Sequence, residues 1–322
     1  MTKGLTKELL ATLLRVKGLG TKSVLKIAQG AEGIETPEAL CKYLGTLSSI
    51  KGLRINSQQL MSSYNEVMRL AEKSEKEGVG LIGYYDANFP RILRNCVDEK
   101  GKPAPPLILY YRGNLEVFEH LGVAIIGTRE PTPNGVKAGQ YFSAALAKQG
   151  FNIISGLAIG CDTAAHEGAL YSGGVTTAFL AHGLNWDSTY PRENRELAEK
   201  IVATGGLLLS EYSIEEKINR YHLVARDRLQ AGLANGTIVI QSGMKGGTMH
   251  AVNATLMAKK PLFAVDFTQK EDLTHEKVQG NLMLFKESKA TPVSSNNIAS
   301  VIDVLTKRPM LANEQPTLFK EL

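Results

Sequence analysis

The stretch NIISGLAIGCDTAAHEGAL at residues 152–170 decides the fold class of this chain. Its first four residues form a short apolar strand, and residues 156–160 begin and end with glycine. The remainder is rich in alanine, which suits a helix that packs closely on a sheet. A strand that passes through a glycine loop into a helix is the repeating unit of parallel α/β sheets. We therefore expect one strand–loop–helix unit here.

The same pattern recurs on both sides of this stretch. Apolar segments separated by helix-length segments are VAIIG at 123–127, NIIS at 152–155, TTAFL at 176–180, GLLLS at 206–210, TIVI at 237–240 and LFAV at 262–265. Six such segments predict an α/β fold, a doubly wound, mostly parallel sheet of the extended Rossmann-like type, with right-handed crossovers. The proline-containing connector at 78–113 should add an edge strand or two.

The segments that flank this repeat differ from it in pattern. Residues 5–76 show apolar positions at helical spacing, so we expect a small helical domain at 1–77, of the helix-hairpin-helix or SAM-like type. The Rossmann-like domain should then cover 78–306, ending in a helix that begins near 294–297. Residues 307–322 are too short and polar for a domain and should form a flexible tail.

Within the helical block, Gly18-Leu19-Gly20 separates two amphipathic stretches. Such a hairpin can place backbone N–H groups on a DNA phosphate. An ordinary tight turn between helices also needs glycine for its positive φ angle. The sequence leaves both interpretations open.

Composition restricts the class of protein. The chain has 322 residues, of which 43% are hydrophobic and 21% are charged, as in ordinary folded proteins. No apolar run reaches the roughly 20 residues that span a bilayer, and the first residues lack a secretory signal, so we expect a cytoplasmic protein without membrane contact. Cys41, Cys96 and Cys161 have no zinc or disulfide spacing and should be reduced, mostly buried thiols.

The positive charge is unevenly distributed. Residues 1–113 contain 17 lysines and arginines against 11 acidic residues, whereas residues 114–322 contain 20 against 21. The basic excess in the first third suits either a nucleic-acid contact or a solvated lysine-rich surface. Any phosphate site in the larger domain must therefore be a local pocket.

Three strand ends carry the residue types that bind phosphate. Gly127-Thr128-Arg129 follows the first strand, and an arginine there can fork onto a phosphate or pair with Glu130. After the second strand, glycines at 156 and 160 allow close approach of the backbone. Asp162 stands at the start of the helix and should be its N-cap, and His166 should be a packing histidine. A metal site of Cys161, Asp162 and His166 is not expected, because adjacent residues of one helix rarely ligate the same metal.

The loop after the fifth strand has the strongest local pattern. Residues 242–248, SGMKGGT, combine glycines, a hydroxyl, a lysine and a following helix N-terminus. The order is not that of a Walker A loop, which argues against magnesium-dependent NTP hydrolysis. Upstream, Arg220, Arg226 and Arg228 form a cluster that suits phosphate or salt bridges with Glu215, Glu216 and Asp227.

The sequence therefore indicates a binding protein rather than an enzyme. We find no catalytic triad, paired carboxylates or metal motif, and we expect no cofactor. Tyr190 and Tyr221 are candidates for base stacking. The expected phosphate contacts are Gly127, Thr128, Arg129, Ser155, Gly156, Gly160, Arg226, Arg228, Ser242, Gly243, Lys245, Gly246, Gly247 and Thr248.

Taken together, VAIIGTREPTPNG, IISGLAIGCDTAAHEGAL, RDRLQAGLA and SGMKGGTMHA resemble the DNA-processing protein A (DprA/Smf) family, with a match over roughly residues 80–305. The resemblance implies a homodimer that binds single-stranded DNA in a basic pocket. It also implies that the chain protects incoming DNA during transformation, in competent cells, and loads a RecA-type recombinase.

Two departures from the family pattern bear on function. The segment FPxRNRxxAGL of the family is LVARDRLQAGL here, so a proline is missing and Asp227 places a negative charge beside Arg226 and Arg228. We expect this charge to weaken phosphate binding locally. Related nucleotide hydrolases carry a glutamate where this chain has Ala251. The alternative function is a nucleotide-ligand sensor or hydrolase, including one that serves in phage defence.

The tail holds one further motif. Gln315, Leu318 and Phe319 fall in QPTLF, which resembles the peptide by which bacterial proteins bind the replicative sliding clamp. A short apolar anchor on a mobile terminus suits such docking. A motif of this length also arises by chance.

Overall fold

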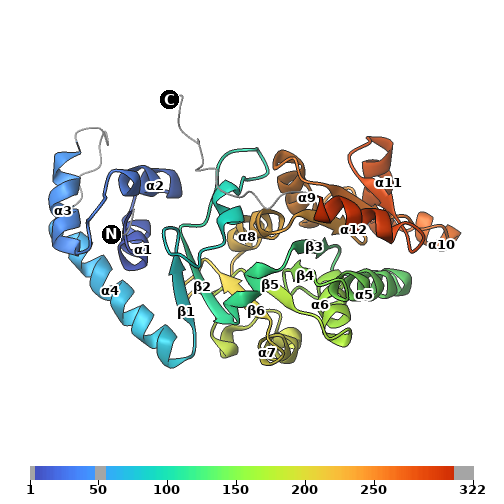
Figure 1. The fold of residues 1–322 in the computed structure, drawn as a ribbon, viewed down its shortest axis with the longest axis horizontal. Helices are drawn as coiled ribbons and strands as arrows, with labels where there is room; N and C mark the ends of the chain where they lie inside the picture. The colour runs from blue at the N-terminus through green and yellow to red at the C-terminus, as the bar shows by residue number, and fades with distance from the viewer. Residues whose placement is uncertain (1–3, 48–55, 308–322) are drawn as a thin grey trace.

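The computed structural model describes residues 4–47 and 56–307 (Figure 1). The chain begins with helices, as the apolar spacing predicts. They are α1 (Lys7–Arg15), α2 (Thr21–Gln29), α3 (Pro37–Thr46) and α4 (Ser57–Lys76). Thr6 and Thr36 cap α1 and α3 by accepting hydrogen bonds from backbone N–H groups three residues later. Gly18 has a φ of 92°, which explains why the α1–α2 turn needs glycine.

A nine-stranded sheet follows the helices, in the order β1-β2-β6-β5-β4-β3-β7-β8-β9. Its strands are β1 (Gly80–Gly83), β2 (Ile108–Gly113), β3 (Gly122–Ile126), β4 (Asn152–Ser155), β5 (Thr176–Leu180), β6 (Leu207–Ser210), β7 (Gly236–Val239), β8 (Leu262–Val265) and β9 (Thr291–Val293). β1 pairs with β2, and β2 with β6, in antiparallel fashion, while the other pairings are parallel. The six predicted parallel strands and the two edge strands from the connector are confirmed, and β9 extends the far edge.

Helices cover both faces of this sheet (Figure 1). They are α5 (Pro133–Ala147), α6 (Cys161–Tyr171), α7 (Arg195–Ala203), α8 (Arg220–Leu233), α9 (Thr248–Met257), α10 (Lys270–Leu273), α11 (Gln279–Lys286) and α12 (Ile298–Thr306). Neighbours α5, α6 and α7 lie on one side in Figure 1, and α8 and α9 on the other. The doubly wound, mostly parallel α/β fold is therefore confirmed.

Alternate residues of the central strand point into two apolar clusters. Val123 and Ile125 of β3 pack with side chains of α5, α6 and α12, whereas Ala124 and Ile126 pack with those of α8 and α9. The second of these clusters also contains apolar residues of α1, α2, α3 and α4. One continuous core thus joins the helical block to the sheet, and the domain boundary near residue 77 stays a prediction.

The sheet has a switch point beside β3. The chain leaves β3 through α5 to reach β4 on one side, whereas it leaves β7, the other neighbour of β3, through α9 to reach β8. The loops after β3 and β7 therefore diverge toward opposite faces and open a crevice at the carboxyl ends of these strands. This is the place where parallel α/β sheets bind ligands.

No helix in the described part of the chain is long and apolar enough to cross a membrane. The three cysteines are unpaired: Cys96 and Cys161 are buried and Cys41 is half-buried, which confirms the prediction of free, mostly buried thiols.

Candidate phosphate-binding site

A cavity of about 930 Å³ lies at the switch point. We call it the switch-point pocket. It is lined by the loop after β3 (126–130), the loop after β7 with the start of α9 (242–251), and residues of α8, with Glu99 and Lys277 on its margin. The structure thus brings together the two predicted loops that are furthest apart in sequence.

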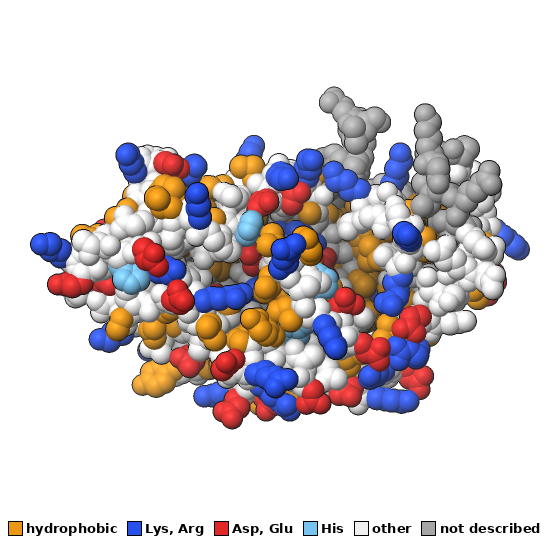
Figure 2. Space-filling model, turned by 180° about the vertical axis from the view of Figure 1, so that it is seen from behind, with side chains coloured by type: hydrophobic (Ala, Val, Ile, Leu, Met, Phe, Trp, Pro, Cys, Tyr) orange, Lys and Arg blue, Asp and Glu red, His pale blue; other side chains and the backbone are white. Residues whose placement is uncertain are grey.

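The charges around the pocket are mixed. Basic side chains come from every wall, namely Arg129, Arg220, Arg226, Lys245 and Lys277, while acidic ones are Glu99, Glu130, Asp162 and Asp227. Figure 2 likewise shows basic and acidic side chains interspersed over one face of the molecule. Attraction for an anion must therefore come from individual groups close to it rather than from the field of a large basic surface.

Arg129 and Lys245 are the cations that the two loops offer to such an anion. Both are exposed, and within residues 4–47 and 56–307 neither has an ion-pair partner. The exposed Arg220 of α8 also has no ion pair among the described residues and contacts the ring of Tyr221.

Lys277 differs, because it lies 3.2 Å from a carboxylate oxygen of Glu130 and 3.1 Å from one of Glu276. Hydrogen bonds to Glu276 and then Glu130 raise the pKa of Lys277. Glu130 is therefore engaged by Lys277 rather than by Arg129, which the sequence left open.

The loop after β7 offers unsatisfied donors. In the described structure, the backbone N–H groups of residues 243–248 have no acceptor within the protein, and Gly247 caps α9 without a side-chain bond. Gly246 has a φ of 134°, a conformation that favours glycine. Free N–H groups and the positive end of a helix dipole together favour an anion.

Asn281, which the sequence analysis missed, holds this loop in place. Its Oδ1 accepts a hydrogen bond of 3.1 Å from the N–H of Ser242, and its amide nitrogen donates to the carbonyls of Ile240 and Val265. Ser242 itself is buried, with its hydroxyl donating to the carbonyl of Gly243. A fully buried asparagine on α11, 39 residues after Ser242, leaves no local signal in the sequence.

The loop after β3 is pressed against its neighbours. A Cβ atom at Gly127 would lie 2.5 Å from Sγ of Cys161 and 2.9 Å from the carbonyl of Gln241. Gly160 has a φ of 86°, and a Cβ there would lie 2.6 Å from the carbonyl of Thr128. The structure therefore assigns both glycines to close packing between loops, which positions Thr128 and Arg129.

Gln241, at the end of β7, ties the two loops together and was also missed. Its carbonyl accepts a 2.7 Å bond from the N–H of Thr128. Its side chain accepts from the N–H of Thr132 and donates to the Thr132 hydroxyl, at 2.8 Å each. A buried amide that ends an apolar strand is the available sequence signal.

Ser155 and Gly156 serve the fold rather than lining the switch-point pocket. The hydroxyl of Ser155 is buried and donates to the carbonyl of Ile125 at 2.7 Å. A side chain at Gly156 would occupy the space of the Arg226 guanidinium. The expected phosphate role of Ser155 is corrected here, since its donor is already used between β4 and β3.

Asp162 is not the N-cap that the sequence predicts. Gly160 holds that position, and the Asp162 carboxylate instead accepts hydrogen bonds from the N–H groups of Gly156 and Ala158, at 3.1 and 3.2 Å. Burial raises the pKa of this carboxyl, although nearby Arg226 opposes the rise. The Asp162 side chain thus stabilises the loop after β4 through hydrogen bonds to its backbone.

Arg226 lies at the floor of the pocket beside Asp227. It is 5% exposed, donates to the carbonyl of Phe179 at 2.9 Å, and has its Nε 3.2 Å from an Asp227 carboxylate oxygen. Burial raises the pKa of Asp227 to about 6, with Arg226 acting in the opposite direction. Part of the charge of Arg226 is thus neutralised inside the protein.

Arg228 does not reach the pocket, contrary to its expected role. Its guanidinium forms two hydrogen bonds with Glu211, at 2.7 and 2.8 Å, and a third with the carbonyl of Ala104. Two residues of a helix point about 200° apart, so Arg226 and Arg228 face opposite sides of α8. Glu215 is likewise engaged elsewhere, by Arg69 and Lys73 of α4.

The remaining predicted residues fall at three places. Nδ1 of His166 is buried 2.7 Å from the Thr176 hydroxyl, and burial lowers the pKa of this histidine to about 3, so it is a packing residue as expected. Tyr190 lies with Arg129 and Arg226 around a small adjoining cavity, whereas Tyr221 contacts Arg220. Gln315, Leu318 and Phe319 lie outside the described residues.

A family model described as DNA recombination-mediator protein A matches residues 80–305. The chain is 35% identical to Protein Smf of Synechocystis over 242 residues, which are 73% of this chain and 58% of that protein. It is 31% identical to the DNA processing protein DprA of Streptococcus pneumoniae over 252 residues, 78% of this chain and 84% of that one. The chain thus spans less than two thirds of the Synechocystis relative.

Solved structures give the same result. The crystal structure of the Streptococcus pneumoniae protein superposes with a TM-score of 0.71 at 26% identity, covering 91% of this chain and 95% of that one. The Helicobacter pylori protein, whose structure was described for its single-stranded DNA binding mode, gives 0.59 at 28% identity, with 70% and 96% covered. The family model covers more than half of the chain, and this chain therefore belongs to the DNA recombination-mediator protein A family.

Proposed function

We propose that this chain is a recombination mediator that holds the phosphates of single-stranded DNA in the switch-point pocket. The observation that carries the proposal is the pairing of two unused binding elements across one cavity. Arg129 lines one side without an ion pair in the described structure, and the N–H groups of 243–248 with Lys245 line the other. Both are suited to bind an anion, because among the described residues neither the Arg129 side chain nor these N–H groups form a hydrogen bond or an ion pair.

The pocket is suited to recognise the sugar-phosphate backbone rather than particular bases. The donors on its two loops are backbone N–H groups and the side chains of Arg129 and Lys245, which contact phosphate oxygens whatever the base. Tyr190, 43% exposed beside Arg129, offers a face for one base. Single-strand binding by the Helicobacter pylori relative supports this assignment. We therefore expect binding without sequence preference.

The pocket also suits binding without hydrolysis. Ala251 lies on its wall where related nucleotide hydrolases carry a glutamate, and its methyl group can neither orient water nor accept a proton. Asp162 and Asp227 are held by backbone N–H groups and by Arg226, respectively. We propose a non-enzymatic binder.

Membership of the family supports a proposal for the partners. We propose that the chain acts as a homodimer, protects single strands from nucleases and loads a RecA-type recombinase on them. Assays of nuclease protection and of recombinase filament formation on strands coated with single-strand-binding protein test these two roles. Deletion of residues 313–322 tests contact with the sliding clamp, and unchanged clamp binding by that variant would dispose of it.

One pair of measurements separates DNA from a nucleotide ligand. An unstructured oligonucleotide should give a gel shift, while a panel of nucleotides should leave the melting temperature unchanged. A ligand that binds the native state at 100 times its Kd stabilises it by about 2.7 kcal/mol, which a thermal scan detects. Stabilisation by a nucleotide without an oligonucleotide shift would instead support the sensor.

A further inference from the structure

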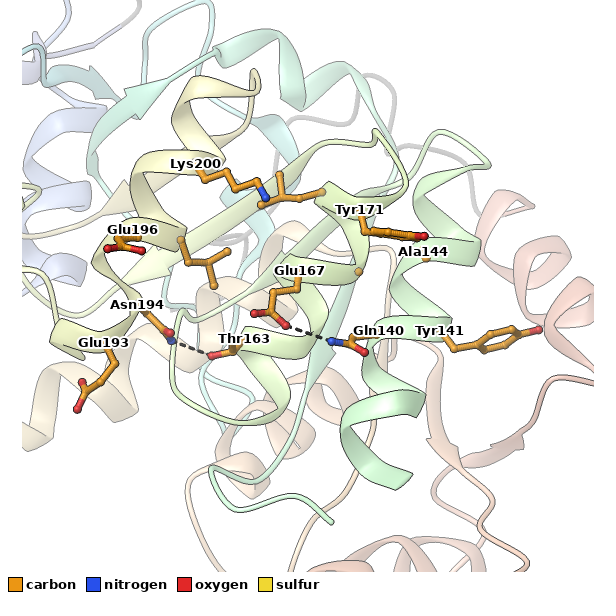
Figure 3. Close-up of a pocket in the computed structure, with 13 residues that line it drawn as sticks. Gln140, Tyr141, Ala144, Thr163, Glu167, Tyr171, Glu193, Asn194, Glu196 and Lys200 are labelled. Carbon is orange, nitrogen blue, oxygen red and sulfur yellow. Dashed lines mark hydrogen bonds between the residues drawn. The ribbon is translucent and has the colours of Figure 1, made fainter. Parts of the chain in front are cut away.

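A second hollow lies over α6, between α5 and α7 (Figure 3). Its volume is about 730 Å³, and we call it the helix groove. Ala144, Leu170 and Leu197 contribute half-buried apolar side chains to it, and Glu167, Glu193 and Glu196 contribute exposed carboxylates. None of the residues described around the helix groove also lines the switch-point pocket.

Close packing of α5 on α6 creates this groove. A Cβ at Gly168 would lie 2.6 Å from the hydroxyl of Ser143, and a Cβ at Gly139 would lie 3.0 Å from the Cβ of Ala164. The Ser143 hydroxyl donates across to the carbonyl of Ala165 at 2.7 Å. The two helices therefore meet backbone to backbone, and the far side of α6 is left recessed below its neighbours.

Two tyrosines near the groove are exposed to water. Tyr171, the last residue of α6, is 92% exposed, and Tyr141 on α5 is 46% exposed. Figure 3 shows the ring of Tyr171 at the end of α6 nearest α5. A tyrosine offers a large apolar area at low entropic cost, which is why the residue is common at the centre of protein interfaces.

The charge around the groove is negative and unpaired. In the ranges 4–47 and 56–307, Glu167, Glu193 and Glu196 have no ion-pair partner, and Lys200 is the one cation among the groove residues. Glu167 accepts a 3.1 Å hydrogen bond from the uncharged side chain of Gln140, drawn in Figure 3. A neighbouring carboxylate, that of Glu199, is by contrast paired with Arg195 at 2.9 Å.

We propose that the helix groove is a docking site for a protein partner that presents a basic amphipathic helix. Leucine-type side chains of that helix would pack on Leu170, Leu197 and Tyr171, and its lysines or arginines would pair with the three glutamates. Carboxylates repel phosphates, so DNA does not compete for this surface. Because the groove and the switch-point pocket are separate, the partner and DNA can bind together.

Two synthetic peptides of 14 residues test the proposal. One combines leucines at helical spacing with lysines, and the other replaces each lysine with glutamate. Fluorescence anisotropy with the full chain should show saturable binding of the lysine peptide and at least tenfold weaker binding of the glutamate peptide. Tyr171→Ala and the double change Glu193→Lys/Glu196→Lys should each weaken the lysine peptide roughly tenfold.

Matched controls place the binding on the groove. Tyr221→Ala removes another exposed tyrosine, and Glu75→Lys/Glu119→Lys reverses two exposed charges elsewhere, so neither should change peptide affinity. Unchanged melting temperature shows that the groove variants fold, and unchanged oligonucleotide affinity shows that the separate DNA site is intact. Equal binding of both peptides, or equal effects of groove and control variants, would overturn the proposal. So would a wild-type dimer that the groove variants dissociate in sedimentation velocity, since the occupant is then a second copy.

Discussion

The guanidinium of Arg226 fills the space directly above Gly156, where any side chain would begin. The contact connects α8 with the loop after β4, and it holds a buried cation against the floor of the switch-point pocket. The glycine at this position is thus required by an arginine that lies 70 residues later in the chain.

Gly156→Ala should therefore weaken single-strand binding and destabilise the fold. The added methyl group displaces Arg226 from the carbonyl of Phe179 and leaves a buried charge without its acceptor. We expect a loss of about 1–3 kcal/mol of unfolding free energy in urea. Gly45→Ala is the control, because a Cβ there meets nothing within 4 Å. Equal stability of the two variants would show that Arg226 can relocate freely.

Single-strand affinity should rise as the pH falls from about 7.5 to 5.5. Asp227 has a pKa of about 6 in the free protein, and a bound phosphate favours its neutral form and raises that pKa further. Protons are therefore taken up on binding, so affinity increases toward low pH, by roughly tenfold for each unit of pKa change.

Asp227→Asn isolates this effect. The variant should bind more tightly at pH 7.5 and show a flatter pH profile in anisotropy titrations, and any remaining slope belongs to groups other than Asp227. An unaltered slope in the variant would remove Asp227 as the responsible group.

The sequence predicts the fold well for a physical reason. Each of the six predicted strands, β3 to β8, is buried on both faces and hence reads as an apolar run, as LLLS and NIIS show. In parallel sheets of this kind the ligand site lies at the carboxyl ends of the strands. Arg129 and the loop at 242–248 could therefore be placed near the pocket from the sequence. The contacts of Gln241 and Asn281 could not, because each bridges elements that are distant in the chain.

Arg228 shows where local reasoning fails. Clustering of arginines along the sequence favours a phosphate site, but helical geometry separates Arg226 from Arg228 and turns Arg228 toward Glu211. Burial would lower the pKa of Arg228, yet the attraction of Glu211 outweighs it and raises that pKa. Glu211 and Arg228 are 17 residues apart, and the sequence gives no sign that they pair.

Removal of either partner of this ion pair should destabilise the protein. Glu211→Ala or Arg228→Ala leaves a largely buried charge unpaired, which costs about 3–5 kcal/mol. Urea unfolding should show the loss, and the double variant should recover part of it. If Arg228→Ala instead keeps full stability and loses DNA affinity, then Arg228 is a phosphate ligand after all.

Thiol reactivity should separate the three cysteines. Burial raises the pKa of Cys96 to about 11 and that of Cys161 to about 12, so neither forms a thiolate near neutral pH. Cys41 is half-buried. Ellman's reagent should titrate one thiol in the native protein and three in guanidinium chloride. Rapid reaction that persists in Cys41→Ser would contradict this assignment.

The salt dependence of single-strand affinity tests the phosphate pocket most directly. Arg129→Ala and Lys245→Ala should each weaken binding and reduce the slope of log affinity against log salt by about 0.7, the value for one neutralised phosphate on a single strand. Lys148→Ala and Lys286→Ala, which remove exposed lysines away from the pocket, should change neither quantity. If the Arg129 and Lys245 variants keep the affinity and slope of the unaltered chain, DNA is not held in the switch-point pocket.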